Sequence, residues 1–234
     1  RAGRDLWGLV VELPDEPRAA DAVEYLVARV RGDQPAALWQ RLTALATALP
    51  DSAVTDNLLW WLADLAEHEL HDPAAALVLY DRLPVDHPRS GLRDDARWRA
   101  ANLARARGDA RGAVDRLRAL LATREVAFGP GSYFSIWLDD AQLLLGTILR
   151  DDLGDHRAAA AAFAQLPRDY PASILVDDAL AALADLALAD GDVAAACRAA
   201  ARLLAHDPDS RFAPHARELV RRPDCPDGGH EAAP

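Results

Sequence analysis

The feature that most constrains the fold of this sequence is a stretch that occurs twice in closely similar form. Residues 81–96 read DRLPVDHPRSGLRDDA, and residues 164–179 read AQLPRDYPASILVDDA. A shift of 83 positions aligns residues 56–122 with residues 139–205 without a gap, and about 25 of the 67 pairs are identical. Self-similarity at a fixed period is the signature of a repeat array, in which each unit packs mainly on its neighbours. The chain is therefore expected to be a row of similar units.

A shorter unit lies inside this period. The pattern Gly-Asp-x-x-x-Ala begins at Gly32, Gly108, Gly154 and Gly191, and His71-Asp72 begins a variant without the glycine. A second marker, a serine followed four residues later by an aspartate, begins at Ser52, Ser90, Ser135 and Ser173. The two markers recur in step, so each unit from the second onwards contains one of each.

Together the markers predict a unit of helix, tight turn and helix. We expect each serine to be an N-cap whose hydroxyl accepts from a first-turn N–H, and the aspartate after it to interact favourably with the helix dipole. The glycine should take the left-handed conformation at the end of the first helix, and the Asp after it should cap the second. The alanine five residues after the glycine should face the partner helix. First helices are predicted over 17–31, 52–70, 91–107, 135–153, 174–190 and 210–221, and second helices over 35–49, 73–83, 110–122, 156–166 and 193–205.

The composition agrees with an all-helical chain. Hydrophobic residues make up 51% of the sequence; Ala and Leu, both strong helix formers, dominate them, whereas Val and Ile are sparse. The predicted fold class is all-α: a right-handed α-solenoid of about five helix pairs with a C-terminal capping helix. The predicted organisation is an N-terminal extension over 1–16, the solenoid over 17–222 and a flexible tail over 223–234.

The pattern resembles the tetratricopeptide repeat over roughly residues 17–221. In that family a small residue follows the Gly-Asp turn, an aromatic or large apolar residue stands nine positions after the glycine, and a proline stands seventeen after it. The ninth positions here are Tyr80, Leu117, Phe163 and Ala200, and the prolines are Pro88, Pro171 and Pro208. The departures are His71 in place of a glycine and Glu125 in place of a proline. Residues 169–216 are also similar to the acidic Tyr-Pro-x-Ser repeats of bacterial TolA-binding cell-division coordinators and outer-membrane assembly lipoproteins.

The resemblance implies a concave groove lined by set positions of the first helices. Carried over to this sequence, these positions give the partner-binding candidates Trp61, Leu65, His68, Asp95, Trp98, Asn102, Arg105, Asp178 and Asp185. Trp98 is read either as ordinary packing or, with Asn102 and Arg105, as a peptide hot spot. The insertion over 123–133 adds Phe128, which either packs into the solenoid or extends the groove. The lysine clamp of chaperone-binding relatives is absent, because the chain has no Lys, and this disfavours capture of an acidic C-terminus.

Other chemistry has little support in the sequence. The net charge is −11 and no basic face is apparent, so nucleic acid is not an expected partner. The histidines of EHELHD, residues 67–72, have the wrong spacing for a zinc protease helix, and no metal or other cofactor is expected. The Asp pairs at 94/95, 139/140 and 177/178 begin repeats, where the helix dipole explains them better than acid–base catalysis does. Cys197 is interpreted as a buried core thiol and Cys225 as part of the tail, with no disulfide framework.

The leading functional hypothesis is a non-enzymatic scaffold that binds a peptide or protein on its concave face, and a more specific version of it places the scaffold in the bacterial cell envelope. The alternative is a regulatory or substrate-recruiting domain of a larger enzyme or signalling protein. No apolar run is long enough to insert this segment into a membrane. The chain lacks Met, so we expect it to be a processed or trimmed piece of a longer protein. A signal peptide, a lipid anchor or a catalytic domain before Arg1 would leave no trace in this sequence. The resemblance favours the periplasm or cell envelope over the cytoplasm.

Overall fold

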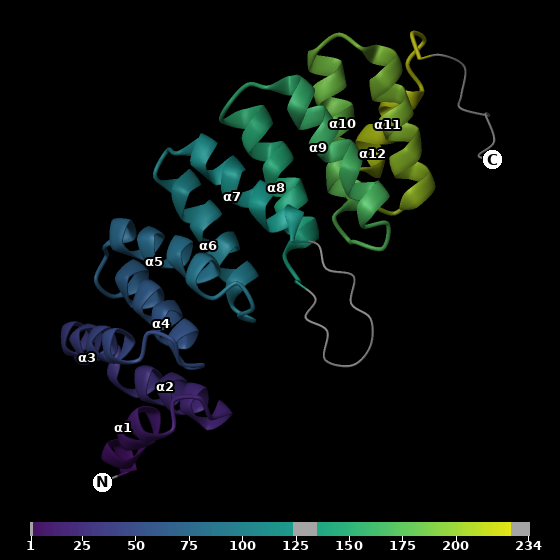
Figure 1. The fold of residues 1–234 in the computed structure, drawn as a ribbon. Helices are drawn as coiled ribbons and strands as arrows, with labels where there is room; N and C mark the ends of the chain where they lie inside the picture. The colour runs from purple at the N-terminus through teal and green to yellow at the C-terminus, as the bar shows by residue number, and fades with distance from the viewer. Residues whose placement is uncertain (1, 124–134, 226–234) are drawn as a thin grey trace. The chain divides into compact units, whose positions relative to one another are not determined.

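The computed structural model describes residues 2–123 and 135–225, and the fold is all-helical over these residues (Figure 1). Twelve α-helices and no β-strand occur in this part of the chain. The helices are α1 (Ala2–Glu12), α2 (Pro17–Val30), α3 (Pro35–Ala48), α4 (Thr55–His68), α5 (Pro73–Asp86), α6 (Arg93–Ala106), α7 (Ala110–Ala122), α8 (Leu138–Asp151), α9 (His156–Asp169), α10 (Val176–Ala189), α11 (Val193–His206) and α12 (Ala213–Val220). Five successive pairs run from α2/α3 to α10/α11, and α12 follows them as predicted.

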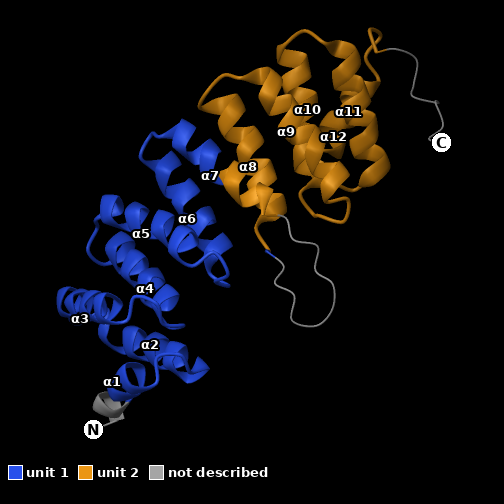
Figure 2. Cartoon of the chain, in the orientation of Figure 1, with its two compact units in different colours: residues 1–116, 127–135 blue, residues 117–126, 136–234 orange. Residues whose placement is uncertain are grey.

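The chain divides into two compact units (Figure 2). In the first, an apolar cluster joins α1 and α2 to α4 through residues such as Val10, Val23 and Leu58, all fully buried. In the second, the largest fully buried side chains include Phe163, Ile148 and Leu180. Among the described residues, no helix is both long and apolar enough to cross a bilayer.

The segment expected to be an N-terminal extension contains a helix that the repeat pattern did not predict. Helix α1 packs on α2, and it buries Trp7 and Val10 in the core shared with α2 and α4. The guanidinium of Arg41 lies 4.2 Å from the centroid of the Trp7 ring, a cation–π contact that joins α1 to α3. The repeat markers do not extend into this segment, so they carried no signal for it.

The turns between paired helices form as predicted in four of the five repeats. Gly108, Gly154 and Gly191 have φ values of 83°, 65° and 79°, and His71 takes the same left-handed region at 53°. This conformation is unusual for a residue with a Cβ atom. The aspartates that follow accept hydrogen bonds from the first turn of the next helix, for example Asp155 from Ala158 N–H and Asp192 from Ala195 N–H, at 3.0 and 2.9 Å.

The first repeat does not follow this pattern, and three expectations for it are wrong. Gly32 does not adopt positive φ, Asp33 does not cap α3, and Ala37 is exposed instead of facing the partner helix. Gln34 is the N-cap residue, and Pro35 begins the helix. Because the turn closes through Gln34 N–H to Val30 C=O at 3.0 Å, it needs neither a left-handed glycine nor an aspartate cap.

The serine marker has a different role from the one predicted. The helices begin three residues after Ser90 and Ser173, and their N-cap residues are Leu92 and Leu175. Each serine hydroxyl does accept a backbone N–H two residues on, at 3.0 Å. Its own proton goes to a carboxylate of the preceding repeat: Ser90 to Asp56, Ser173 to Asp139 and Ser210 to Asp177, at 2.6, 2.6 and 2.5 Å. For Ser90 and Ser173, the serine of one marker and the aspartate of the preceding serine marker are therefore the donor and the acceptor of an inter-repeat hydrogen bond.

Two second helices are longer than predicted. Helices α5 and α9 continue to Asp86 and Asp169, past Pro84 and Pro167, whereas the sequence suggested ends at 83 and 166. Proline removes one backbone donor and crowds the carbonyl four residues earlier. Here the helix ends only two residues later, so few bonds depend on that position.

The cysteines form a disulfide, which corrects the expectation of a free core thiol. Cys197 of α11 bonds to Cys225, and their Cα atoms are 5.9 Å apart. The bond ties the segment after α12 to α11 across a separation of 28 residues. A loop of this size corresponds to a stabilisation of about 3.6 kcal/mol in the chain-entropy treatment. Residues 226–234, the rest of the predicted tail, lie outside the described part.

Candidate functional site

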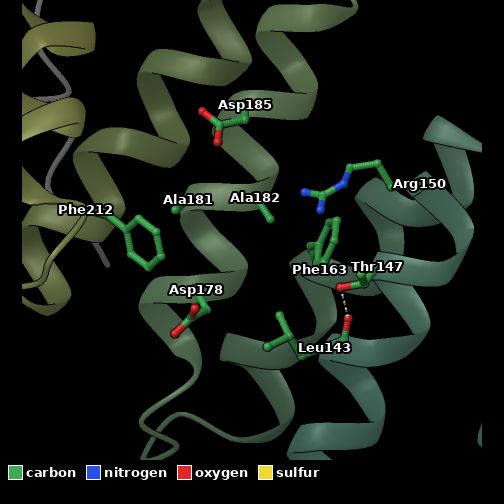
Figure 3. A pocket seen from close by; sticks show the side chains of 9 residues that line it. All are labelled: Leu143, Thr147, Arg150, Phe163, Asp178, Ala181, Ala182, Asp185 and Phe212. Carbon is green, nitrogen blue, oxygen red and sulfur yellow. Dashed lines mark hydrogen bonds between the residues drawn. The ribbon is translucent and has the colours of Figure 1, made fainter. Parts of the chain in front are cut away.

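The second unit contains a cavity of about 230 Å³ on the side of α8 and α10 (Figure 3). Leu143, Thr147 and Arg150 come from α8, Phe163 from α9, and Asp178, Ala181, Ala182 and Asp185 from α10, while Phe212 precedes α12. The cavity has an aromatic and small-residue lining with three charged side chains at its edge. Asp178 and Asp185, two of the predicted partner-binding residues, line it together.

The base of the cavity depends on close packing between α8 and α9. Phe163 is fully buried, and its Cε1 atom would lie 2.5 Å from a Cβ atom built on Gly146. The absence of a side chain at Gly146 therefore lets the ring approach α8. The guanidinium of Arg150 lies 5.5 Å from the centre of the same ring. Phe163 thus supports both the packing of the helix pair and the position of a cavity cation.

The charges around the cavity already have partners within the chain. Arg150 donates to both carboxylate oxygens of Asp151, at 2.6 and 3.1 Å, and these hydrogen bonds raise its pKa. Asp178 accepts a hydrogen bond from Nη2 of Arg211. Asp185 pairs with Nε2 of His215 at 3.1 Å. The cavity lining therefore carries the two carboxylates of Asp178 and Asp185 and one guanidinium, that of Arg150, whose charge is neutralised by Asp151.

The other predicted residues that the structure describes lie in the first unit and do not share this cavity. Trp61 is half-buried and packs against the core cluster of that unit. Asn102 is exposed and donates to the carbonyl of Trp98 at 2.9 Å. Trp98, Asp95 and Arg105 are half-buried on α6. Leu65, expected in the groove, is instead fully buried. Phe128 lies outside the described residues.

His68 belongs to a charge network that the sequence did not reveal. Its centre is Asp64, whose side chain is only 10% exposed. Nη2 of Arg31 lies 2.8 Å from Asp64 Oδ2 as an ion pair without hydrogen-bond geometry, and Arg99 and His68 approach the other oxygen at 3.6 and 3.5 Å. These residues come from α4, α6 and the end of α2, so the network joins neighbouring repeats.

The network reaches the core through a tyrosine. The hydroxyl of Tyr80 donates to Glu67 at 3.1 Å, and burial, reinforced by the Glu67 charge, raises its pKa. A tyrosine that stays protonated keeps this donor at every physiological pH. The partners of Asp64 lie about one repeat before it and one repeat after it in the sequence, so no local pattern predicts the network. The one available signal was the position of an aspartate on the inner side of the predicted helix.

A second cavity, in the first unit, has a different character. It has a volume of about 440 Å³ and lies among α3, α4 and α5. Trp39, Leu59, Leu62 and Leu79 supply most of the apolar lining, and Arg82 is the charged residue. Within the described residues, no cluster of three or more His, Cys, Asp or Glu side chains is arranged to hold a metal ion.

Comparison with known proteins identifies the repeat. The tetratricopeptide repeat family model matches residues 140–173, which include most of α8, the Gly154 turn and α9. No curated protein matches the sequence significantly. The match confirms the predicted tetratricopeptide repeat over these residues.

Solved structures share the fold at low sequence identity. MamA has a TM-score of 0.54 and 16% identity, with 78% of this chain and 94% of that chain covered. BtubC from P. vanneervenii has a TM-score of 0.60 and 12% identity, with 99% and 92% covered. YrrB, described as a TPR protein with an unusual peptide-binding site, has a TM-score of 0.55 and 13% identity, with 91% and 97% covered. At these identities the likeness concerns the fold.

Proposed function

We propose that this protein is a non-enzymatic scaffold that binds a peptide or protein segment in the α8–α10 cavity. The observation that carries the proposal is the coincidence of two independent features. Asp178 and Asp185 occupy groove positions of the tetratricopeptide repeat, and the structure places them on one cavity with Phe163 and Phe212. A concave site with an apolar base and a few polar groups is the usual form of a recognition site. The peptide-binding site named for YrrB, a protein of similar fold, supports the same reading.

The site of binding can be tested by photo-crosslinking. A photoreactive residue at Ala182, on the cavity wall, should form a specific adduct with a partner in cells of the source organism. The same residue at Arg198, on the exposed side of α11, is the matched control. An adduct at Ala182 alone supports binding at the cavity. Equal adducts at both positions, or an adduct at Arg198 alone, would contradict it.

We also propose that the scaffold works in an oxidising compartment, the bacterial cell envelope. The Cys197–Cys225 disulfide supports this proposal, since such bonds persist in the periplasm and are rare in the cytosol. Cell fractionation and maleimide labelling provide the test. We expect the protein in the envelope fraction, with both cysteines unreactive until a reductant is added. A cytosolic protein with two reactive thiols would refute the location.

A further inference from the structure

The charge distribution around the α8–α10 cavity indicates what kind of segment it accepts. Helix α10 has the sequence VDDALAALADLALA, with three aspartates and no basic residue. Arg150 is the cationic lining residue, and it is held by both oxygens of Asp151. An acidic segment would therefore meet two carboxylates and no uncommitted cation. A basic segment would meet complementary charge, which favours encounter and fixes register.

The side chains that now pair with the two aspartates are displaceable. The side chain of Arg211, which pairs with Asp178, is 72% exposed, and that of His215, which pairs with Asp185, is 53% exposed. Exposed pairs of this kind contribute little to stability because solvent screens them and ordering long side chains costs entropy. A partner's guanidinium or ammonium group can take their place at a small cost.

The spacing of the aspartates sets a length for the partner segment. Asp178 and Asp185 are seven residues apart on one helix, so they lie on the same face about 10.5 Å apart along its axis. An extended chain covers this distance in about three residues. Between the two carboxylates, Ala181 and Ala182 leave room beside the rings of Phe163 and Phe212 (Figure 3).

We infer that the cavity binds an extended basic segment of a protein partner. Two Arg or Lys residues about three positions apart engage Asp178 and Asp185, as the spacing above requires. An apolar residue between them contacts Ala182 and the ring of Phe212, both of which are partly exposed. This inference rests on the proposed function, because it describes the partner of the same cavity. It goes further by assigning the charge and spacing that the partner must carry.

Selection from a phage-displayed library of random peptides tests the inference. The full chain is the bait, and a double variant, Asp178→Asn with Asp185→Asn, is used for counter-selection. We expect the enriched peptides to carry paired basic residues around an apolar one. Enrichment of acidic or uncharged peptides at the cavity would overturn the inference and leave the proposed function standing. Failure to enrich any peptide that depends on the cavity would overturn both.

Binding of a selected peptide, measured by fluorescence anisotropy, gives the second part of the test. Asp185→Asn should weaken binding about fivefold to tenfold, as expected for a partly desolvated charge pair, and added salt should reduce the remaining difference. Asp190→Asn is the matched control, because Asp190 is an exposed aspartate at the end of the same helix that pairs with His156 outside the cavity. Equal losses in the two variants would show a general charge effect and refute specific recognition.

Discussion

The hydrogen bond between Ser173 and Asp139 predicts a measurable coupling between neighbouring repeats. Its O–O distance of 2.6 Å is typical of a hydroxyl donating to a carboxylate, and such bonds are about twice as strong as neutral ones. Ser173→Ala removes this bond and also the acceptor for Leu175 N–H. Hydrogen bonds to charged groups contribute about 1.5–3 kcal/mol, so we expect a loss of about 2 kcal/mol, compared with about 1 kcal/mol for a simple N-cap.

A double-mutant cycle separates the two roles. Ser173→Ala, Asp139→Ala and the double variant are unfolded in denaturant, and the coupling free energy is the departure from additivity. We expect a coupling of about 1–2 kcal/mol for a charge-assisted bond of this kind. Ser173→Ala with Asp140→Ala serves as the control, because Ser173 donates to Asp139 rather than to its neighbour. If Ser173 and Asp139 prove additive within about 0.3 kcal/mol, the serine acts only within its own repeat and the inter-repeat bond is refuted.

Two further predictions concern the pair of helices α8 and α9. Burial, with the neighbouring charge of Asp139, raises the pKa of Asp140, so its ionisation disfavours folding at neutral pH. Asp140→Asn should therefore raise the denaturation midpoint at neutral pH. This gain should shrink as the pH falls through the raised pKa of Asp140 towards the ordinary pKa of an aspartate. An unchanged midpoint at neutral pH would contradict this prediction. Gly146→Ala should cost about 1–3 kcal/mol through overpacking against Phe163, whereas Gly8→Ala, which meets no atom within 4 Å, should stabilise α1 by about 0.5–1 kcal/mol. Thermal melts that move in the same direction for both glycines would argue against close packing at Gly146.

Features of the fold that depend on nearby residues could be predicted from the sequence. A Gly-Asp turn specifies its own backbone: the glycine permits positive φ, and the aspartate caps the helix that follows within three residues. The turns at Gly154 and Gly191 therefore form as expected. The exception at Gly32 shows the limit of this reasoning, since Pro35 supplies an equivalent start for α3 without using the marker.

Features that depend on distant partners were missed or misinterpreted. The hydroxyl of Ser173 has a local acceptor role that the sequence suggests, but its donor role involves Asp139, 34 residues earlier. Asp64 pairs with Arg31, which precedes it by about one repeat in the sequence, and with Arg99, which follows it by about one repeat. The disulfide partner of Cys197 lies in a polar segment that showed no pattern of its own. Each of these requires the stacking of repeats or the docking of the end segment, which local patterns do not encode.

The candidate site also combines features that local sequence predicts with features that depend on distant residues. The paired aspartates at the repeat starts show this. The helix dipole accounts for negative charge at both positions but does not distinguish the two residues. The structure does: in α10, Asp177 accepts the hydroxyl of Ser210 from the next turn segment, whereas Asp178 lines the cavity. In α8, Asp139 accepts from Ser173, and Asp140 has no comparable serine among its interactions and carries a raised pKa. In α8 and α10 the first aspartate of the pair is therefore fixed by a hydroxyl of the following repeat, and in α10 the second lines the cavity in which we propose that the partner binds.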